Sequence, residues 1–203
     1  MINDSSDCIF TKNKLCMVHL RKIIIYLLTG IFLLFVLQLG LLENISQYLY
    51  SIRNQYFSTF DYHYDDFIPY LPLVIMLGLK LNGVKSRSSW KEMLLTSLLS
   101  FALMWLVVYL IKTFTGVIRP DVSDALSFPS GHTATAFTAA CLLYKEYGSR
   151  FSWITICAFL PAVLTGITRI LNNKHWLSDV AGGMVVGIIV VEILYLSRRE
   201  PGK

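Results

Sequence analysis

Three short polar clusters interrupt a chain that is otherwise strongly apolar. The first is Lys112–Pro120, the second is Pro129–His132, and the third begins at Thr168 and ends at Asp179. Each cluster stands at an end of an apolar segment, so side chains from all three could meet in one pocket. The residue types in the clusters indicate what chemistry such a pocket would support.

Three cations in the clusters, Lys112, Arg119 and Arg169, have no acidic partner that the sequence assigns. Like charges repel one another unless an anion neutralises them, and arginine matches tetrahedral oxyanions through paired hydrogen bonds. Ser130 and Gly131 begin an expected helix, whose free backbone N–H groups would favour an anion. These five residues predict a phosphate-binding site.

His175 and Asp179 are four residues apart, so on a helix they would share a face. A carboxylate there can hold one ring nitrogen protonated and leave the other free as a nucleophile or base. His132 supplies a second imidazole, which we expect to be the general acid. Two histidines and one already partnered acid are a poor ligand set for zinc. We therefore expect phosphoryl transfer without a metal ion or another cofactor.

Each of these residues also has an ordinary structural explanation when it is considered alone. Lys112 could snorkel from a helix end, Arg119 could lie in a simple loop, and His175 could be an interfacial residue. A Pro-Ser-Gly sequence is common in turns. The functional interpretation depends on the occurrence of all these residues together. His19 and His63 receive no role.

The order and spacing of these residues resemble the signature of the type 2 phosphatidic acid phosphatase superfamily, which is K-x6-R-P, P-S-G-H and S-R-x5-H-x3-D. Here the motifs read Lys112-x6-Arg119-Pro120, Pro129-Ser130-Gly131-His132 and Thr168-Arg169-x5-His175-x3-Asp179. They extend over roughly a third of the chain. Thr168 replaces the usual serine but keeps a hydroxyl group, so we expect at most a modest effect.

The resemblance implies a bundle of six membrane helices and metal-independent dephosphorylation through a phosphohistidine. By motif position, His175 would attack phosphorus and Asp179 would orient it. His132 would protonate the leaving oxygen and then help to activate water. The other matched residues would hold the phosphoryl oxygens: Lys112, Arg119, Arg169, Ser130 and Gly131. The superfamily also contains vanadate-dependent haloperoxidases, which are larger and soluble, so the membrane spans argue against that branch.

The composition independently indicates an all-α membrane protein. Of the 203 residues, 55% are hydrophobic and 15% are charged, and the mean hydropathy is +0.56. A soluble domain averages about 45–50% apolar and about 25% charged residues. These values exclude a disordered chain, a coiled coil and a typical cytosolic enzyme. The four cysteines lack C-x2-C spacing and predict neither a disulfide scaffold nor a zinc cluster.

An apolar segment of about 20 residues can cross a membrane as a helix. Three uncharged segments meet this description: 23–42, 93–111 and 151–168. Three weaker segments contain prolines or polar residues: 67–84, 130–144 and 176–196. We interpret the weaker segments as helices that line a polar site, with a re-entrant or interfacial segment as the alternative for each. The sequence therefore predicts six transmembrane helices with the site at the outer membrane face.

The first apolar run is longer than an ordinary signal-peptide core, and no small-x-small cleavage pattern follows it. We expect it to remain as an anchor. This gives a cytoplasmic N-terminal segment (1–22), a six-helix membrane phosphatase domain (23–196, with the motif region at 112–179) and a cytoplasmic tail (197–203).

Basic residues predict the orientation of the spans. Thirteen of the 18 Lys and Arg residues flank the spans on one side. The positive-inside rule places that side, and both termini, in the cytoplasm. The site would then face the periplasm of a bacterial inner membrane. The net charge of +5 mostly reflects this topology, so we expect no nucleic-acid partner.

The external segment 43–66 is rich in aromatic residues, and its residues Ile45, Leu49, Ile52 and Tyr56 recur at helical spacing. This pattern predicts an amphipathic helix in the outer interface. The helix could be an anchoring aromatic belt or a wall for a lipid substrate. The spacing of Gly183 and Gly187 allows close helix contact, for which packing within the bundle is the preferred explanation over dimerisation.

The leading hypothesis from the sequence is a membrane lipid phosphate phosphatase. Undecaprenyl pyrophosphate, phosphatidylglycerophosphate and lipid A all fit, because the site reads the phosphate that they share. Lys174 could contact a second phosphate or a sugar, or could be an ordinary loop lysine. The alternatives are a lipid-linked phosphotransferase that uses the same residues, and a non-catalytic lipid-binding or transport protein. The sequence makes no prediction about the oligomeric state.

Overall fold

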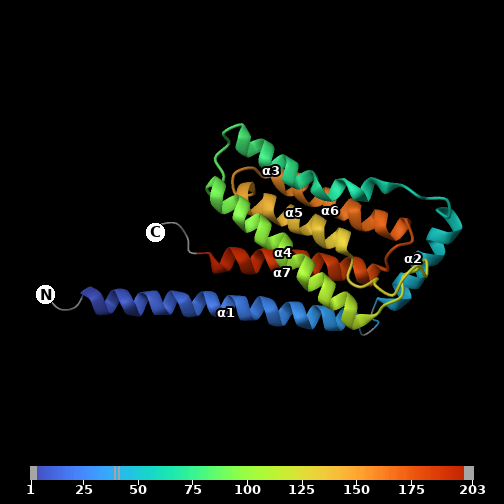
Figure 1. Ribbon diagram of the computed structural model, residues 1–203, viewed down its shortest axis with the longest axis horizontal. Helices are drawn as coiled ribbons and strands as arrows, with labels where there is room; N and C mark the ends of the chain where they lie inside the picture. The colour runs from blue at the N-terminus through green and yellow to red at the C-terminus, as the bar shows by residue number, and fades with distance from the viewer. Residues whose placement is uncertain (1–3, 39, 41, 199–203) are drawn as a thin grey trace.

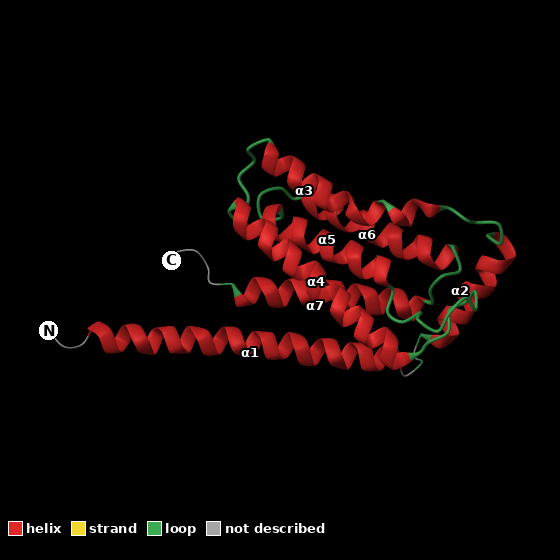
Figure 2. Ribbon diagram, viewed as in Figure 1, coloured by secondary structure: helices red, strands yellow, loops and turns green. Residues whose placement is uncertain are grey.

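The computed structural model describes residues 4–38, 40 and 42–198, with side chains from residue 18 onward except at position 38. Within these ranges all regular structure is helical (Figure 2), as the composition predicted. The elements in chain order are α1 (Asp4–Gln38), α2 (Glu43–Tyr56), the 3-10 turns η1 (His63–Asp66) and η2 (Ile68–Tyr70), α3 (Leu71–Leu81), α4 (Trp90–Thr115), α5 (Gly131–Tyr147), α6 (Trp153–Leu171) and α7 (Leu177–Ser197).

The long helices run alongside one another between two ends of the molecule (Figure 1). The α3–α4 and α5–α6 connections lie at the end where α1 begins and α7 finishes. The α4–α5 and α6–α7 connections lie at the opposite end, where α2 crosses the bundle. All three polar clusters of the sequence are therefore brought to one end, away from most of the basic residues.

Helix α5 occupies the centre of the bundle and packs against α3, α4, α6 and α7. Nearly all of its residues are buried, and many are small. Close approach to α7 requires glycine, because a Cβ at Gly183 would lie 2.5 Å from the Ser130 carbonyl oxygen and a Cβ at Gly187 would lie 2.7 Å from that of Ala134. The expected use of these glycines in packing within the bundle is confirmed.

Four helical segments are long and apolar enough to cross a membrane: Val18–Leu37 of α1, and α4, α6 and α7. The six predicted spans are not confirmed, because α3 has 11 residues and α5 has 17. Two prolines, Pro69 and Pro72, shorten the regular part of the α3 segment. Helix α5 is enclosed by protein and has no need of an apolar lipid-facing surface.

Several boundaries differ from those expected. Helix α1 begins at Asp4, so most of the expected N-terminal segment 1–22 is helical and continuous with the first apolar run. Only Ser197 and Arg198 of the expected tail belong to the part of the chain that the structure describes. Helix α4 ends at Gly116, whose φ of 58° suits glycine, and this end places Lys112 in the last turn.

Candidate active site

The nucleophile candidate and its acid are in contact. His175 Nδ1 lies 3.3 Å from Asp179 Oδ2, and both side chains are buried, at 3% and 0% exposure. The sequence predicted this pair on one helical face, but His175 precedes α7, which starts at Leu177. The loop backbone brings the two together, because Asp179 also accepts a hydrogen bond from the Trp176 N–H at 2.7 Å. The same carboxylate thus caps α7 and holds the histidine.

Ser127 completes the contacts of this carboxylate. Its hydroxyl donates to Asp179 Oδ2 and lies 3.5 Å from His175 Nδ1. The backbone joins the same elements, since the Ser130 N–H donates to the Asp179 carbonyl at 2.9 Å. The sequence analysis missed Ser127, and nothing in its spacing distinguishes it from other loop serines. Its role follows from the path of the α4–α5 connection.

The surroundings of His175 leave Nε2 as the nitrogen with a free lone pair. Asp179 Oδ2 can only accept hydrogen bonds, so the Nδ1 facing it carries the proton. Burial lowers the pKa of His175 to about 4, although hydrogen bonding to Asp179 acts in the opposite direction. The imidazole is therefore neutral near pH 7. Nε2 faces Arg119, whose Nη1 lies 3.4 Å away.

Arg119 and Lys112 both contact backbone carbonyls of the connections around the site. Arg119 donates from Nη1 to the Lys174 carbonyl at 3.3 Å and from Nε to Asp124 Oδ1 at 2.8 Å. Lys112 donates to the carbonyls of Leu126 and Ser127. Both cations therefore hold the α4–α5 connection closed around the site.

Arg169 approaches from the last turn of α6 and is 9% exposed. Its Nη1 pairs with the fully buried Asp65, which also accepts a hydrogen bond from Asn172 at 3.2 Å. Its Nε is buried and has no hydrogen-bond partner among the described residues. An orphaned buried donor is costly, and a bound phosphoryl oxygen would satisfy it.

The expectation that the cations lack acidic partners is wrong for two of them. Arg119 pairs with Asp124 and Arg169 pairs with Asp65, both from connections that the motif does not include. The sequence could not assign these pairs because they depend on how the loops fold. The one available signal was the adjacent acid pair Asp65–Asp66 on the same side as the cations.

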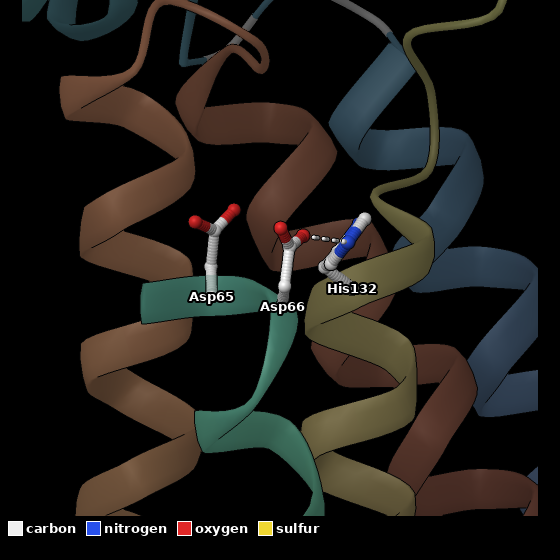
Figure 3. Close-up of side chains that lie close together, drawn as sticks. All are labelled: Asp65, Asp66 and His132. Atoms are coloured by element: carbon white, nitrogen blue, oxygen red, sulfur yellow. Dashed lines mark ion pairs between the residues drawn. The ribbon is translucent and has the colours of Figure 1, made fainter. Parts of the chain in front are cut away.

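The PSGH motif forms the start of α5. Ser130 is the N-cap residue, and its hydroxyl accepts a hydrogen bond from the Thr133 N–H at 3.4 Å. A Cβ at Gly131 would meet only the Trp105 ring at ordinary contact distance, so packing alone does not require glycine there. His132 projects toward η1, where its Nε2 lies 3.5 Å from Asp66 Oδ1 (Figure 3).

Asp65, Asp66 and His132 bring their ligand atoms within 4.8 Å of one another and so form a group that could hold a cation (Figure 3). The donor set fits a cation poorly, because the Asp65 carboxylate is already engaged by the Arg169 guanidinium and by Asn172. A second positive ion there would lie beside a buried arginine.

Helix α2 forms a wall beside the nucleophile. Tyr50 packs on Trp176 with ring centroids 5.5 Å apart, and Arg53 Nε donates to the Leu171 carbonyl at 2.9 Å. A small cavity there is lined by residues of α2 and of the α6–α7 connection, His175 included. The predicted helix in segment 43–66 is confirmed at Glu43–Tyr56, while its use as an aromatic belt or as a wall for a lipid stays a prediction.

Two further residues from the sequence analysis, Lys174 and Thr168, have partners within the protein. Lys174 pairs with Asp121, with 2.6 Å between Nζ and Oδ2. The Thr168 hydroxyl donates to the Leu164 carbonyl at 2.9 Å, one turn back in α6. A threonine in this place thus satisfies its hydroxyl within the helix.

Residues 93–202 match the PAP2 superfamily. This match extends over more than half of the chain and includes all three motifs, so the chain belongs to the PAP2 superfamily.

Two relatives illustrate the branch. The chain is 42% identical over 153 residues to lipid A 1-phosphatase of Porphyromonas gingivalis, covering 75% of this chain and 34% of that protein. It is 30% identical over 132 residues to phosphatidylglycerophosphatase B of Bacillus subtilis, covering 59% of this chain and 63% of that protein. The chain thus spans about a third of the first relative and less than two thirds of the second.

Two crystal structures share the fold. The PAP2-type phosphatidylglycerolphosphate phosphatase of Bacillus subtilis superposes with a TM-score of 0.61 at 21% identity, covering 86% of this chain and 94% of that one. LpxE of Aquifex aeolicus superposes with a TM-score of 0.54 at 26% identity, covering 73% and 93%.

Proposed function

We propose that this protein is a membrane lipid phosphatase that removes a phosphate group through a phosphohistidine at His175, without a metal ion. One observation carries the proposal. A neutral, buried imidazole is held by Asp179 at Nδ1, and Arg119 Nη1 lies 3.4 Å from its Nε2. This places a nucleophile beside a binding site for an anion.

In the first step, His175 Nε2 attacks phosphorus as the bond from phosphorus to the lipid oxygen breaks. His132 gives its proton to that oxygen, so the lipid leaves as an alcohol, or as a phosphate from a pyrophosphate. Asp179 stabilises the positive charge on the phosphorylated imidazole. A phosphoryl group bound between Nε2 and Arg119 would replace their present contact. The interactions of the cations with the phosphoryl oxygens would strengthen as negative charge develops in the transition state, and such interactions supply most of the catalysis.

In the second step, His132 is neutral and takes a proton from water as the water oxygen attacks phosphorus. The P–N bond breaks, inorganic phosphate leaves, and His175 and His132 return to their starting states. Lys112, Ser130 and Gly131 are proposed to hold phosphoryl oxygens together with the two arginines. The same residues would serve a phosphotransferase, in which an alcohol replaces the water.

Lipid A is the first substrate to test, because the P. gingivalis relative is a lipid A 1-phosphatase. Phosphatidylglycerophosphate follows from the name of the B. subtilis relative. Undecaprenyl pyrophosphate remains a candidate because it offers the same terminal phosphate.

We place the protein in a bacterial inner membrane with both termini in the cytoplasm and the site at the periplasmic face. In support, the site lies at the end of the bundle opposite the α3–α4 and α5–α6 connections, which carry Lys85, Arg87 and Arg150. The positive-inside rule assigns such connections to the cytoplasm.

The test is phosphate release by purified protein in detergent from the three lipids, with EDTA present. We expect release from at least one lipid and a loss of about 10³-fold or more in His175→Ala, as for other removed nucleophiles. His19→Ala, in the middle of α1 and outside the three motifs, is the control and should retain full activity. Vanadate should inhibit, because it imitates the trigonal bipyramidal transition state. Release that survives in His175→Ala, or that EDTA abolishes, would contradict the mechanism.

A further inference from the structure

The second imidazole of the site has an acidic partner from outside the three motifs. His132 Nε2 lies 3.5 Å from Asp66 Oδ1, and both side chains are partly exposed, at 40% and 49% (Figure 3). The charged groups that face His132 are Arg169 from α6 and the carboxylates Asp65 and Asp66 from η1. His132 therefore lies near two carboxylates and one guanidinium, and Arg169 is itself paired with Asp65.

The backbone that carries Asp66 is held firmly against α6. The neighbouring Asp65 is fully buried and pairs with Arg169, and Asn172 donates to its Oδ1 at 3.2 Å. The Asn172 side chain also bonds both the carbonyl and the N–H of Tyr62, at 2.8 and 3.2 Å. These contacts fix η1, so Asp66 has a defined place beside His132.

We propose that Asp66 is a positioning residue for His132, which holds the imidazole in place and favours its protonated form before the leaving group departs. This inference rests on the function proposed above and extends it to a residue outside the motifs. The site would then contain two histidine–aspartate pairs with different tasks. Asp179 keeps His175 oriented as a nucleophile, and Asp66 favours the protonated form of His132 against the effect of burial.

The charges explain why a second acid is needed. Burial lowers the pKa of His132 and Arg169 lowers it further, while the charge of Asp65 is already paired with that arginine. Asp66 offsets the arginine, because a carboxylate within a few ångströms favours the charged imidazole. His132 gives a proton to the leaving oxygen and regains one from water in the second step. Because Asp66 favours the protonated imidazole, it also favours this return to the starting state.

The inference predicts that the cost of losing Asp66 depends on the leaving group. Asp66→Asn keeps the shape of the side chain and removes its charge. Nitrophenolate leaves readily without protonation, whereas the sugar hydroxyl of lipid A requires it. The parameter kcat/KM includes the steps up to departure of the first product, so it reports the role of the acid. The probes are lipid A and 4-nitrophenyl phosphate.

We expect Asp66→Asn to lower kcat/KM for lipid A by about tenfold or more and for 4-nitrophenyl phosphate by no more than about threefold, since general acid catalysis typically contributes 10²–10⁴-fold. The basic limb of the lipid A profile should move to lower pH, because the protonated form of His132 is lost sooner. Asp66→Glu should restore much of the activity. Asp61→Asn, an exposed acid five residues earlier, is the matched control and should match the parent protein.

Equal losses on the two substrates with an unchanged pH profile would assign Asp66 a merely structural role and overturn the inference. Where 4-nitrophenyl phosphate is not hydrolysed, the pH profile on lipid A decides alone. If EDTA abolishes the activity of the parent protein and Asp66→Asn is also inactive, the cluster of Asp65, Asp66 and His132 binds a cation. That result would also overturn the inference. No release from any of the three lipids by the parent protein would contradict the proposed function itself. Release that needs His175 but not Asp66 would contradict only this inference.

Discussion

At the scale of single residues, Asp179 illustrates how one side chain serves structure and chemistry together. Its Oδ2 accepts from the Trp176 N–H, from the Ser127 hydroxyl and from His175 Nδ1. Three donors to one oxygen leave the carboxylate little freedom to rotate. The start of α7 and the orientation of the nucleophile therefore depend on the same group.

Asp179→Asn should keep the fold and lose most activity, because an amide can turn its NH₂ group toward Nδ1 and stabilise the wrong tautomer of His175. We expect kcat to fall by about 10²–10⁴-fold, as when the acid of a catalytic triad is replaced. Phosphate release and thermal unfolding of the purified variant would measure this. Asp61→Asn provides the control, and an Asp179→Asn enzyme with parental kcat would contradict the role given to the carboxylate.

The buried state of His175 predicts an unusual pH dependence. Its pKa is lowered to about 4, so its nucleophilic neutral form persists as the pH falls well below the ordinary histidine value of 6.5. The acid limb of kcat/KM that reports His175 should therefore lie far below pH 6.5. If the acid limb of kcat/KM lies near pH 6.5 and arises from His175, the imidazole is not buried in the way described here.

The same shift affects stability with a definite sign. Below pH 6.5 the unfolded chain binds a proton at His175 that the folded protein does not bind, so stability falls as the pH drops from 6.5 toward 4. Thermal unfolding measured across this range should show the decline, and His175→Asn should reduce it.

At the scale of elements, the contact between α5 and α7 decides where the PSGH motif stands. The contact is close enough that only glycine fits at positions 183 and 187, and it holds the Ser130 backbone beside Asp179. Helix α5 is central and short, and helix α7 supplies the acid, so their spacing sets the geometry of the site.

Gly183→Ala should therefore impair both stability and activity. The new Cβ would lie 2.5 Å from the Ser130 carbonyl oxygen, and backbone must move to accommodate it. We expect a loss of about 1–3 kcal/mol in the free energy of unfolding, as for other overpacked sites, together with reduced phosphate release.

Gly78→Ala in α3 is the matched control, because nothing lies within 4 Å of a Cβ there. It should be neutral or stabilising by up to about 1 kcal/mol, since alanine favours a helix interior over glycine. Equal effects of the two alanine substitutions would show that the α5–α7 contact does not control the site.

At the scale of the whole molecule, the bundle separates a basic end from an end that carries the site (Figure 1). Four helical segments have the length and composition of membrane spans, and α5 is sheltered among them. The aromatic segment and α2 lie at the site end, where a lipid substrate would approach from the membrane.

The proposed topology can be tested with single cysteines in a background without the native ones. Ser58→Cys lies at the site end and Lys85→Cys in the α3–α4 connection, and both positions are exposed. A membrane-impermeant maleimide applied to cells with a permeable outer membrane should label only Ser58→Cys. Lys85→Cys should react after the inner membrane is disrupted. The reverse pattern would place the site in the cytoplasm.

Much of the site could be predicted from the sequence, because catalytic chemistry limits residue types and because adjacent motif residues keep their spacing in any fold. The pairing of His175 with Asp179 and the meeting of three clusters at one end were predictable for this reason. The all-helical class followed equally from composition, since a membrane requires that each backbone polar group be satisfied within its own segment.

Only the tertiary structure decided which loops hold the motifs. Ser127, Asp65, Asp66 and Asp124 are ordinary residues in sequence and acquire roles by packing against His175, Arg169, His132 and Arg119. The number of spans was also beyond the sequence, because hydropathy cannot distinguish a helix buried in protein from one that faces lipid. Long-range contacts between loops depend on the whole chain's path, which no local pattern records.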